Sequence, residues 1–332
     1  MKKLIFLFVA FLTVGFLTAQ NVSTTKTTGD HNDSKTVQTG DLQDAAVEQE
    51  GDYNDVDVDQ FTDNEGPQEA NAYQKGDRND ATIDMDQTGG GGNTPANTAD
   101  IDQIGDWNKS YQKTNAPGYN SGQHVTGYQE GDHNDLKQFI YNGYNTNQYS
   151  KQLGDRNKSI QKSWGAYKDL DIVSDGDYNE AYQTAKSAKA DLDIDQLGDR
   201  NFAKQYFEGS FGFVSGNTGD IDQTGSWNES HQLMDGKTGV DMAANIIGDH
   251  NFTYQKSEGD RDDATAFISG DRNESRMYQD GDDNGASLWS VGDRNEFYQK
   301  QEGDDNGQRF YKVVAIGTMV KSARREMTTR LM

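Results

Sequence analysis

The chain has 332 residues, of which 32% are hydrophobic, and its formal net charge is -24 at pH 7. Low hydrophobicity with high charge excludes an ordinary globular core and is typical of disorder, yet 16 Tyr, 14 Phe and 4 Trp are too many aromatic residues for a disordered tail. So acidic a body also repels nucleic acid and anionic lipid, and we expect neither as a partner.

The N-terminus carries an export signal. Lys2 and Lys3 precede an apolar run from Leu4 to Leu17, and Ala19 follows shortly after. This pattern predicts a secretory signal peptide over residues 1–19, because the run is too short for a membrane span. We therefore expect an exported, soluble mature chain that starts with a short segment, 20–28. The sequence has no Cys, so export brings no disulfide framework to stabilise it.

A Gly-Asp-x-Asn tetrapeptide returns along residues 29–312, and in unbroken runs its glycine falls on every eleventh or every twenty-second position. Elsewhere the interval is stretched by insertions rich in Gly, Asn and Pro, as in 88–100 and 114–123. The count resumes after each insertion, so we expect the insertions to be surface loops on a repeating scaffold. The most regular glycines, which we predict to be turn residues, are Gly248, Gly259, Gly270, Gly281, Gly292 and Gly303.

Each unit predicts one short strand and one tight corner. After Gly51, the small or amide side chains of Val56, Val58 and Gln60 alternate and so share one face of a strand. Gly-Asp-x-Asn is turn chemistry, because Gly and Asn tolerate positive φ and Asp can close an Asx turn. A period of 11 also fits a right-handed coiled coil, but a glycine in every unit and the lack of an apolar seam oppose a helix.

The predicted fold is all-β, a β-solenoid in which two 11-residue half-coils make one coil of about 22 residues, with loop insertions. About 24 units give about 12 coils and a rod about 58 Å long at about 4.8 Å per coil. Equivalent amides then stack one coil apart and supply cohesion without aliphatic bulk. The predicted ladders are Asn251, Asn273 and Asn295 on one edge, Asn284 and Asn306 on the other, and Gln279 with Gln301.

The same stacking collects Asp282, Asp283, Asp304 and Asp305 on one edge. Four neighbouring carboxylates repel unless a cation bridges them, which makes these residues weak candidates for Ca²⁺. The alternative is a solvated acidic edge in which Asp serves the turn. The sequence contains no nucleophile motif, so we expect no catalytic residues and no cofactor.

The pattern Gln-x-Gly-x-x-Asn-x-Ala-x3-Gln resembles the curlin repeat, the unit of curli amyloid fibre subunits. It stands here as Gln49, Gly51, Asn54, Val56 and Gln60, and again as Gln74, Gly76, Asn79 and Ala81 and as Gln196, Gly198, Asn201 and Ala203. The resemblance implies an exported, non-enzymatic subunit that polymerises through its open solenoid ends into cell-surface fibres for adhesion and biofilm. It also implies three partners: further copies of the chain, a related fibre subunit and an outer-membrane export pore.

The segment 313–332 does not match the repeat and is basic, since from Arg309 onward there are six Lys or Arg residues and one acid. In the curlin family a divergent basic end marks the nucleating subunit and is linked to surface attachment. A disordered end or a poorly matched last coil are the alternatives, so the sequence leaves open whether this is a major subunit or a nucleator. The alternative function is a non-polymerising secreted solenoid adhesin that binds carbohydrate or Ca²⁺, with Trp107 and Trp227 facing out at corners.

Overall fold

The structure, a computed structural model, describes residues 21–63, 66–88, 96–117, 122–186, 189–209, 216, 218–235, 239–305, 307–314 and 319–325. These residues form 26 β-strands in two parallel sheets. Within the described ranges, no helix has the length and apolar character to cross a membrane. The expected signal peptide lies outside them.

Odd-numbered strands form sheet A and even-numbered strands form sheet B. The strands of sheet A are β1 (Val22–Thr28), β3 (Gln43–Glu50), β5 (Gln68–Lys75), β7 (Asn97–Ile104), β9 (Gln123–Glu130), β11 (Thr146–Leu153), β13 (Lys168–Asp175), β15 (Ala190–Leu197), β17 (Asp220–Thr224), β19 (Asp241–Ile247), β21 (Asp263–Ser269), β23 (Gly285–Val291) and β25 (Gly307–Val314). The strands of sheet B are β2 (Asp33–Thr39), β4 (Asp55–Thr62), β6 (Asp80–Thr88), β8 (Lys109–Pro117), β10 (Asp135–Tyr144), β12 (Lys158–Ala166), β14 (Glu180–Ala185), β16 (Phe202–Glu208), β18 (Glu229–Asp235), β20 (Phe252–Ser257), β22 (Glu274–Asp280), β24 (Glu296–Glu302) and β26 (Met319–Arg325).

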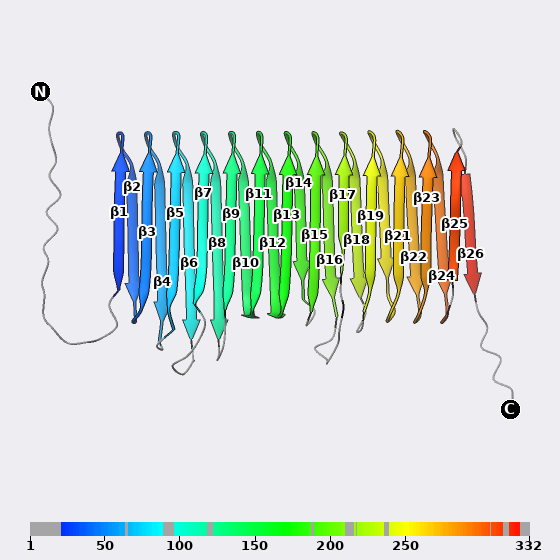
Figure 1. Ribbon diagram of the computed structural model, residues 1–332, viewed down its shortest axis with the longest axis horizontal. Coiled ribbons are helices and arrows are strands. Elements are labelled where there is room, and N and C mark those ends of the chain that lie inside the picture. The colour runs from blue at the N-terminus through cyan, green and yellow to red at the C-terminus, as the bar shows by residue number, and fades with distance from the viewer. Residues whose placement is uncertain are drawn as a thin grey trace, which may run out of the picture.

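Each odd strand and the even strand after it make one coil, and the coils stack into a rod (Figure 1). The register joins residues one coil apart, such as Val22 with Asp44 and Leu170 with Leu192. The predicted all-β solenoid, with two repeat units in each coil, is therefore confirmed. The 24 predicted units correspond to β2 through β25, and β1 and β26 add one strand at each end.

Strands also form on both sides of the segment 29–312, to which the repeat was assigned. β1 lies within the segment 20–28 and pairs with β3, while β26 lies within the segment 313–332 and pairs with β24. Neither strand carries the Gly-Asp-x-Asn unit. Each can still pair, because the edge of a parallel sheet offers backbone N–H and C=O groups to any extended segment.

The core is a narrow space between the two sheets. In β4, for example, Val56, Val58 and Gln60 are fully buried, whereas Asp57 and Asp59 between them face out. Ala, Val, Ile and Leu share the interior with many Gln, Asn and Ser side chains. The predicted interior, slim and partly filled by amides, is confirmed.

The two edges of the rod differ. On one edge, the uniform edge, every connection from sheet A to sheet B has four residues, such as Gly51–Asn54 between β3 and β4. On the other, the variable edge, the connections from sheet B to the next strand of sheet A range from one residue to eleven. Figure 1 shows matching tight corners along the upper edge and unequal connections along the lower one. The insertions noted in the sequence all lie on the variable edge.

Candidate assembly site

Each described corner of the uniform edge begins with a glycine. The φ angles of these glycines lie between 97° and 121°, a region that other residues rarely adopt. A Cβ atom on Gly131 would lie 2.2 Å from the carbonyl oxygen of Gly154 in the next coil. Close stacking of successive corners therefore requires glycine. The twelve are Gly29, Gly51, Gly76, Gly105, Gly131, Gly154, Gly176, Gly198, Gly225, Gly248, Gly270 and Gly292.

The corners continue the backbone pairing of the strands. The N–H of Gly51 donates to the carbonyl of Thr28, and the N–H of Tyr53 donates to the carbonyl of Asp30, both at 2.9 Å. Tyr53, two residues after its glycine, has a φ of 60°. The sequence predicts positive φ at Gly and Asn, and this prediction is wrong for Asn. The left-handed residue is the one between Asp and Asn, and its conformation aims the N–H at the preceding coil.

The asparagine of each corner binds the next coil twice. The Oδ1 of Asn134 accepts the backbone N–H of Asn157 at 2.8 Å, and its Nδ2 donates to the carbonyl of Gly154 at 2.8 Å. Asn134 is only 1% exposed, so these bonds satisfy polar groups that water does not reach. The predicted Asn251, Asn273 and Asn295 belong to this ladder. Its bonds run mainly from side chain to backbone and not only between amides.

The aspartate of each corner binds in the opposite direction. The Oδ1 of Asp132 accepts the backbone N–H of Asp106 in the preceding coil at 2.8 Å. The predicted Asx turn within one corner is therefore replaced by a bond between two corners. This role explains why Asp follows Gly so regularly. At Ser226 a hydroxyl takes the place of the carboxylate and accepts from Asp199 at 3.4 Å.

Glutamine side chains form ladders inside both sheets. The Nε2 of Gln129 donates to the Oε1 of Gln152 at 2.8 Å and to the carbonyl of Lys109 in the facing sheet at 3.1 Å. The predicted pair, Gln279 and Gln301, is aligned in register in β22 and β24. Their amides donate to the carbonyls of Asp263 and Gly285, respectively. Glutamine thus ties neighbouring coils together and also ties sheet A to sheet B.

The variable edge repeats this chemistry less faithfully. Gly259, Gly281 and Gly303 lie on it, as does Asn284, and Asn306 lies outside the described residues. The backbone N–H of Asn284 donates to Asp262, which stands where an Asn would extend the predicted ladder. Burial raises the pKa of Asp262. A buried carboxyl at this position shows that amides are not obligatory on this edge.

The four acidic candidates for Ca²⁺ also lie on the variable edge. Asp283 forms an ion pair with Arg261, and Asp304 accepts the backbone N–H of Asp282 at 3.0 Å. Among the residues that the structure describes, no group of three or more His, Asp or Glu side chains is placed to hold a metal ion. Through these contacts, the acids bind neighbouring coils to one another.

The left-handed corner residues form an exposed column along the uniform edge. Neighbours stack ring on ring, as His31 does on Tyr53 at 4.6 Å, or guanidinium on ring, as Arg200 does on Tyr178 and Trp227 at 5.0 and 5.1 Å. The left-handed conformation costs a non-glycine residue about 1 kcal/mol or more, and these stacking contacts offset that cost. The column is His31, Tyr53, Arg78, Trp107, His133, Arg156, Tyr178, Arg200, Trp227, His250, Arg272 and Arg294. Trp107 and Trp227, 47% and 53% exposed, face out as predicted.

The two ends of the rod differ from its interior. Every internal strand is hydrogen-bonded to a neighbour on both sides, whereas β1, β2, β25 and β26 each have one neighbour among the described residues. Successive residues of a parallel strand bond alternately to the two sides. The carbonyl of Thr28 bonds to β3 through Gly51, so Thr27 and Thr25 direct their backbone groups away from β3. The ends therefore present rows of N–H and C=O groups with the same spacing as the interior.

Residues 29–61 match the family model of the curlin associated repeat. The match spans about three units and confirms the resemblance over that segment, whereas the later copies are identified by motif and by the fold they share with it. No curated protein matches the sequence. The curlin repeat and the β-solenoid together indicate a curlin-like structural protein.

Proposed function

We propose that the protein is a secreted, non-catalytic fibre subunit. Copies join end to end, and the resulting cell-surface fibre serves adhesion and the biofilm matrix. The observation that carries the proposal concerns the end strands, which among the described residues pair on one side while all internal strands pair on two. A strand edge that is left open templates the addition of another strand.

The corner ladders favour addition in one orientation. In the interior, each Asn extends toward the C-terminal neighbour and each Asp toward the N-terminal neighbour. The carbonyl of Gly29 and the N–H of Asn32 occupy the positions that, in later corners, receive the preceding Asn. A second copy stacked head to tail would extend the backbone ladders with the same polarity. In a head-to-head contact, the end strands of the two copies would run antiparallel, unlike the strands inside each sheet.

The partners follow from the same proposal. Further copies of the chain bind at the solenoid ends, and a related fibre subunit would bind there by the same backbone pairing. Export would pass through an outer-membrane pore, as the resemblance to the curlin repeat implies. The basic segment 313–332 would contact an acidic cell surface. This attachment is separate from growth, so Lys321→Gln, Arg324→Gln and Arg325→Gln together should reduce attachment and leave the growth rate unchanged.

The test blocks one end. Thr25→Pro removes an N–H that points away from β3, so it spares the internal pairing of β1 while blocking the approach of another strand. Thr25→Val keeps the N–H and a β-branched side chain and is the matched control. We expect growth on preformed seeds, followed by thioflavin fluorescence, to be abolished at that end for Thr25→Pro and normal for Thr25→Val. Equal growth of the two variants, or a wild-type chain that stays monomeric, would refute end stacking.

One observation favours a second function. The exposed column of aromatic and Arg side chains on the uniform edge offers stacking surfaces for sugar rings, as an adhesin that binds carbohydrate would need. Trp107→Ala with Trp227→Ala should then weaken binding to a polysaccharide and leave the growth of fibres unchanged. An unchanged affinity would exclude this alternative.

A further inference from the structure

The outer surface of sheet B carries cationic and aromatic side chains in its middle third. Lys158 lies 5.3 Å from the ring centre of Tyr182, and Lys162 lies 5.7 Å from that of Phe139. The strands β12, β14 and β16 carry two acids, and each accepts a hydrogen bond from a tyrosine on its own strand. Glu180 accepts the hydroxyl of Tyr182, and Glu208 accepts the hydroxyl of Tyr206. We call this surface the basic face, and define it by Lys158, Lys162, Tyr182, Phe202, Lys204 and Tyr206 on β12, β14 and β16.

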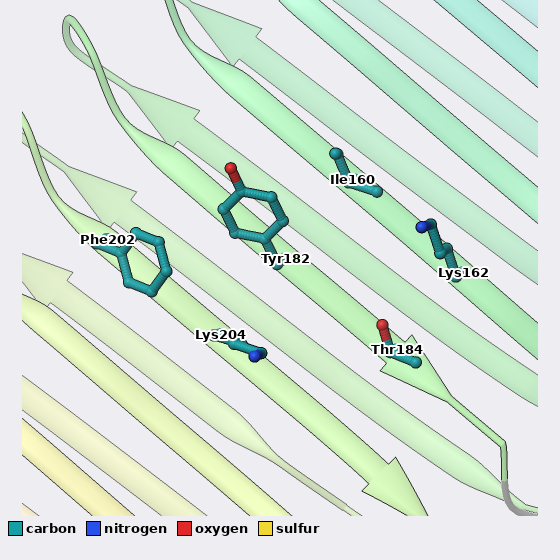
Figure 2. A pocket seen from close by; sticks show the side chains of 6 residues that line it. All are labelled: Ile160, Lys162, Tyr182, Thr184, Phe202 and Lys204. Carbon is teal, nitrogen blue, oxygen red and sulfur yellow. The ribbon is translucent and has the colours of Figure 1, made fainter.

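The basic face is hollowed. A groove of about 300 Å³ runs across its three strands, with Lys162 and Lys204 beside Thr184 and the rings of Tyr182 and Phe202 at one end. Figure 2 shows these side chains standing on neighbouring strands around the small Thr184. The groove is open and has aromatic walls with ammonium groups beside them. Such a surface suits a partner that offers carboxylates together with apolar side chains.

The outer surface of sheet A on the same coils has the opposite charge. Its acids stack in register, Asp171 next to Asp193, Asp193 next to Asp220, and Asp195 next to Asp222. No ion pair among the described residues involves them, and the outward positions of β13, β15 and β17 hold no Lys or Arg. We call this surface the acidic face, and define it by Asp171, Asp191, Asp193, Asp195, Asp220 and Asp222.

The acidic face also has a groove and an apolar projection. A hollow of about 400 Å³ is lined by Asp195 and Asp222 together with Val173 and Leu197. Leu197 is 53% exposed. Burial and neighbouring carboxylates raise the pKa of Asp193 to about 7 and that of Asp171 to about 6, as expected for stacked acids that repel one another. Cations brought from outside would stabilise this face.

The two faces overlap along the rod, because β13 and β14 form one coil, β15 and β16 form the next, and β12 and β17 flank these two coils. A second copy moved sideways, without rotation or shift along the rod, would therefore place its acidic face on the first copy's basic face. Both faces have the strand spacing of about 4.8 Å, so each row of Lys and aromatic residues meets a row of Asp in step. The contact leaves one face of each copy free, so it continues into a layer.

We propose that the acidic face of one copy binds the basic face of another, so that solenoids associate side by side. The contact covers few coils and is weak for an isolated pair. In a fibre it recurs once per subunit, and avidity makes it effective. The gain from avidity rests on the proposed function, because it requires a fibre. The binding of one face to the other does not require a fibre.

The test uses charge reversal. The acid-reversed chain carries Asp191→Lys, Asp193→Lys, Asp195→Lys, Asp220→Lys and Asp222→Lys, which makes the acidic face net positive, and the base-reversed chain carries Lys158→Glu, Lys162→Glu and Lys204→Glu. Each chain alone has two faces of like charge, whereas a mixture of the two restores both contacts. We expect at least about a tenfold loss of bundled fibres in electron micrographs for each chain alone, and recovery in the equimolar mixture. Thioflavin growth rates should not change, which separates this result from a failure of end stacking.

Controls keep the outcome decisive. The variant Asp55→Asn, Asp57→Asn and Asp59→Asn removes three acids from β4, outside the acidic face, and should bundle like the wild type. If a reversed chain does not fold, the corresponding Asp→Asn and Lys→Gln variants replace it. If no fibres form, sedimentation velocity at low salt measures the same pairing between single chains.

Two outcomes would overturn the proposal: bundling that survives each reversal alone, or a mixture that fails to restore it. Alginate, an acidic polysaccharide, tests whether the basic face binds a different anion instead of the acidic face. If wild-type chains do not associate sideways but bind alginate through Lys158, Lys162 and Lys204, the basic face is a polysaccharide site instead.

Discussion

The uniform edge and the variable edge close the same coils by different means. On the uniform edge the described interior corners, such as Gly131–Asn134, have four residues, a glycine in contact with the next glycine, and a buried asparagine that binds forward. On the variable edge a single residue, Tyr167, suffices between β12 and β13, and eleven residues separate β16 from β17. The strands keep their register right up to the variable edge, as β13 and β15 do from Lys168 and Ala190 onward. The strand pairing therefore does not require the motif, and the motif has a task of its own.

That task is to set the stacking of the coils. Backbone atoms of adjacent corners approach more closely on the uniform edge than a Cβ atom would allow, and Asn and Asp bind in opposite directions along the axis. A row of corners with these constraints has one register. The variable edge can then accept insertions, because the length of a surface connection costs little. The comparison predicts that damage to the uniform edge will be far more harmful.

The largest effect is expected from Gly131→Ala. The added Cβ would lie 2.2 Å from the carbonyl oxygen of Gly154, and φ at this position is 112°. We expect the free energy of unfolding to fall by about 3–5 kcal/mol, measured by denaturant titration. Gly285→Ala is the control, because nothing lies within 4 Å of its added Cβ. Equal losses for the two variants would contradict the role given to the corner glycines.

A smaller loss is expected when one ladder asparagine is removed. Asn134→Ala leaves the carbonyl of Gly154 and the N–H of Asn157 without their partner, which should cost about 2–4 kcal/mol. Asn284→Ala on the variable edge should cost about half as much, since the Nδ2 of Asn284 binds Gly281 within its own corner. Thermal melting of both variants checks the order, and the reverse order would argue against a stacking role for the uniform edge.

The acidic face predicts a pH dependence. Burial, with Asp195, Asp171, Asp220 and Asp222 nearby, raises the pKa of Asp193 to about 7 in the folded chain, from about 3.9 when unfolded. The folded chain therefore binds the extra proton, and its stability should decline as the pH rises through this window. We expect a higher melting temperature at pH 5 than at pH 8, and a smaller difference in Asp193→Asn. An equal or higher melting temperature at pH 8 would show that the face carries no such strain.

The smallest effect is expected from shortening the variable edge. Deleting residues 89–92 from the connection between β6 and β7 should change the free energy of unfolding by less than about 0.5 kcal/mol. Inserting four glycines between Asp132 and His133 on the uniform edge is the matched change and should remove more than about 2 kcal/mol. Denaturant titration of the two variants measures the difference between the edges directly.

The count of 11 was enough to predict the strands, the corners and the inward residues, because a strand alternates and Val56, Val58 and Gln60 follow that period. It did not separate the two edges, although corners one full coil apart, such as Gly248 and Gly270, are more alike than corners half a coil apart, such as Gly248 and Gly259. Nor did it find the charged faces. Their acids and lysines, such as Asp193 and Lys162, occupy outward positions, and only the strand order shows which of them stack.

Fibre diffraction tests the central claim, stacking of solenoid ends, most directly. Subunits of thirteen coils joined without a gap should give a reflection at about 4.8 Å along the fibre axis and an axial repeat of about 62 Å. A strand-spacing reflection that lies across the axis, or fibres that lack an axial repeat of one subunit length, would show that the chains do not join through their ends.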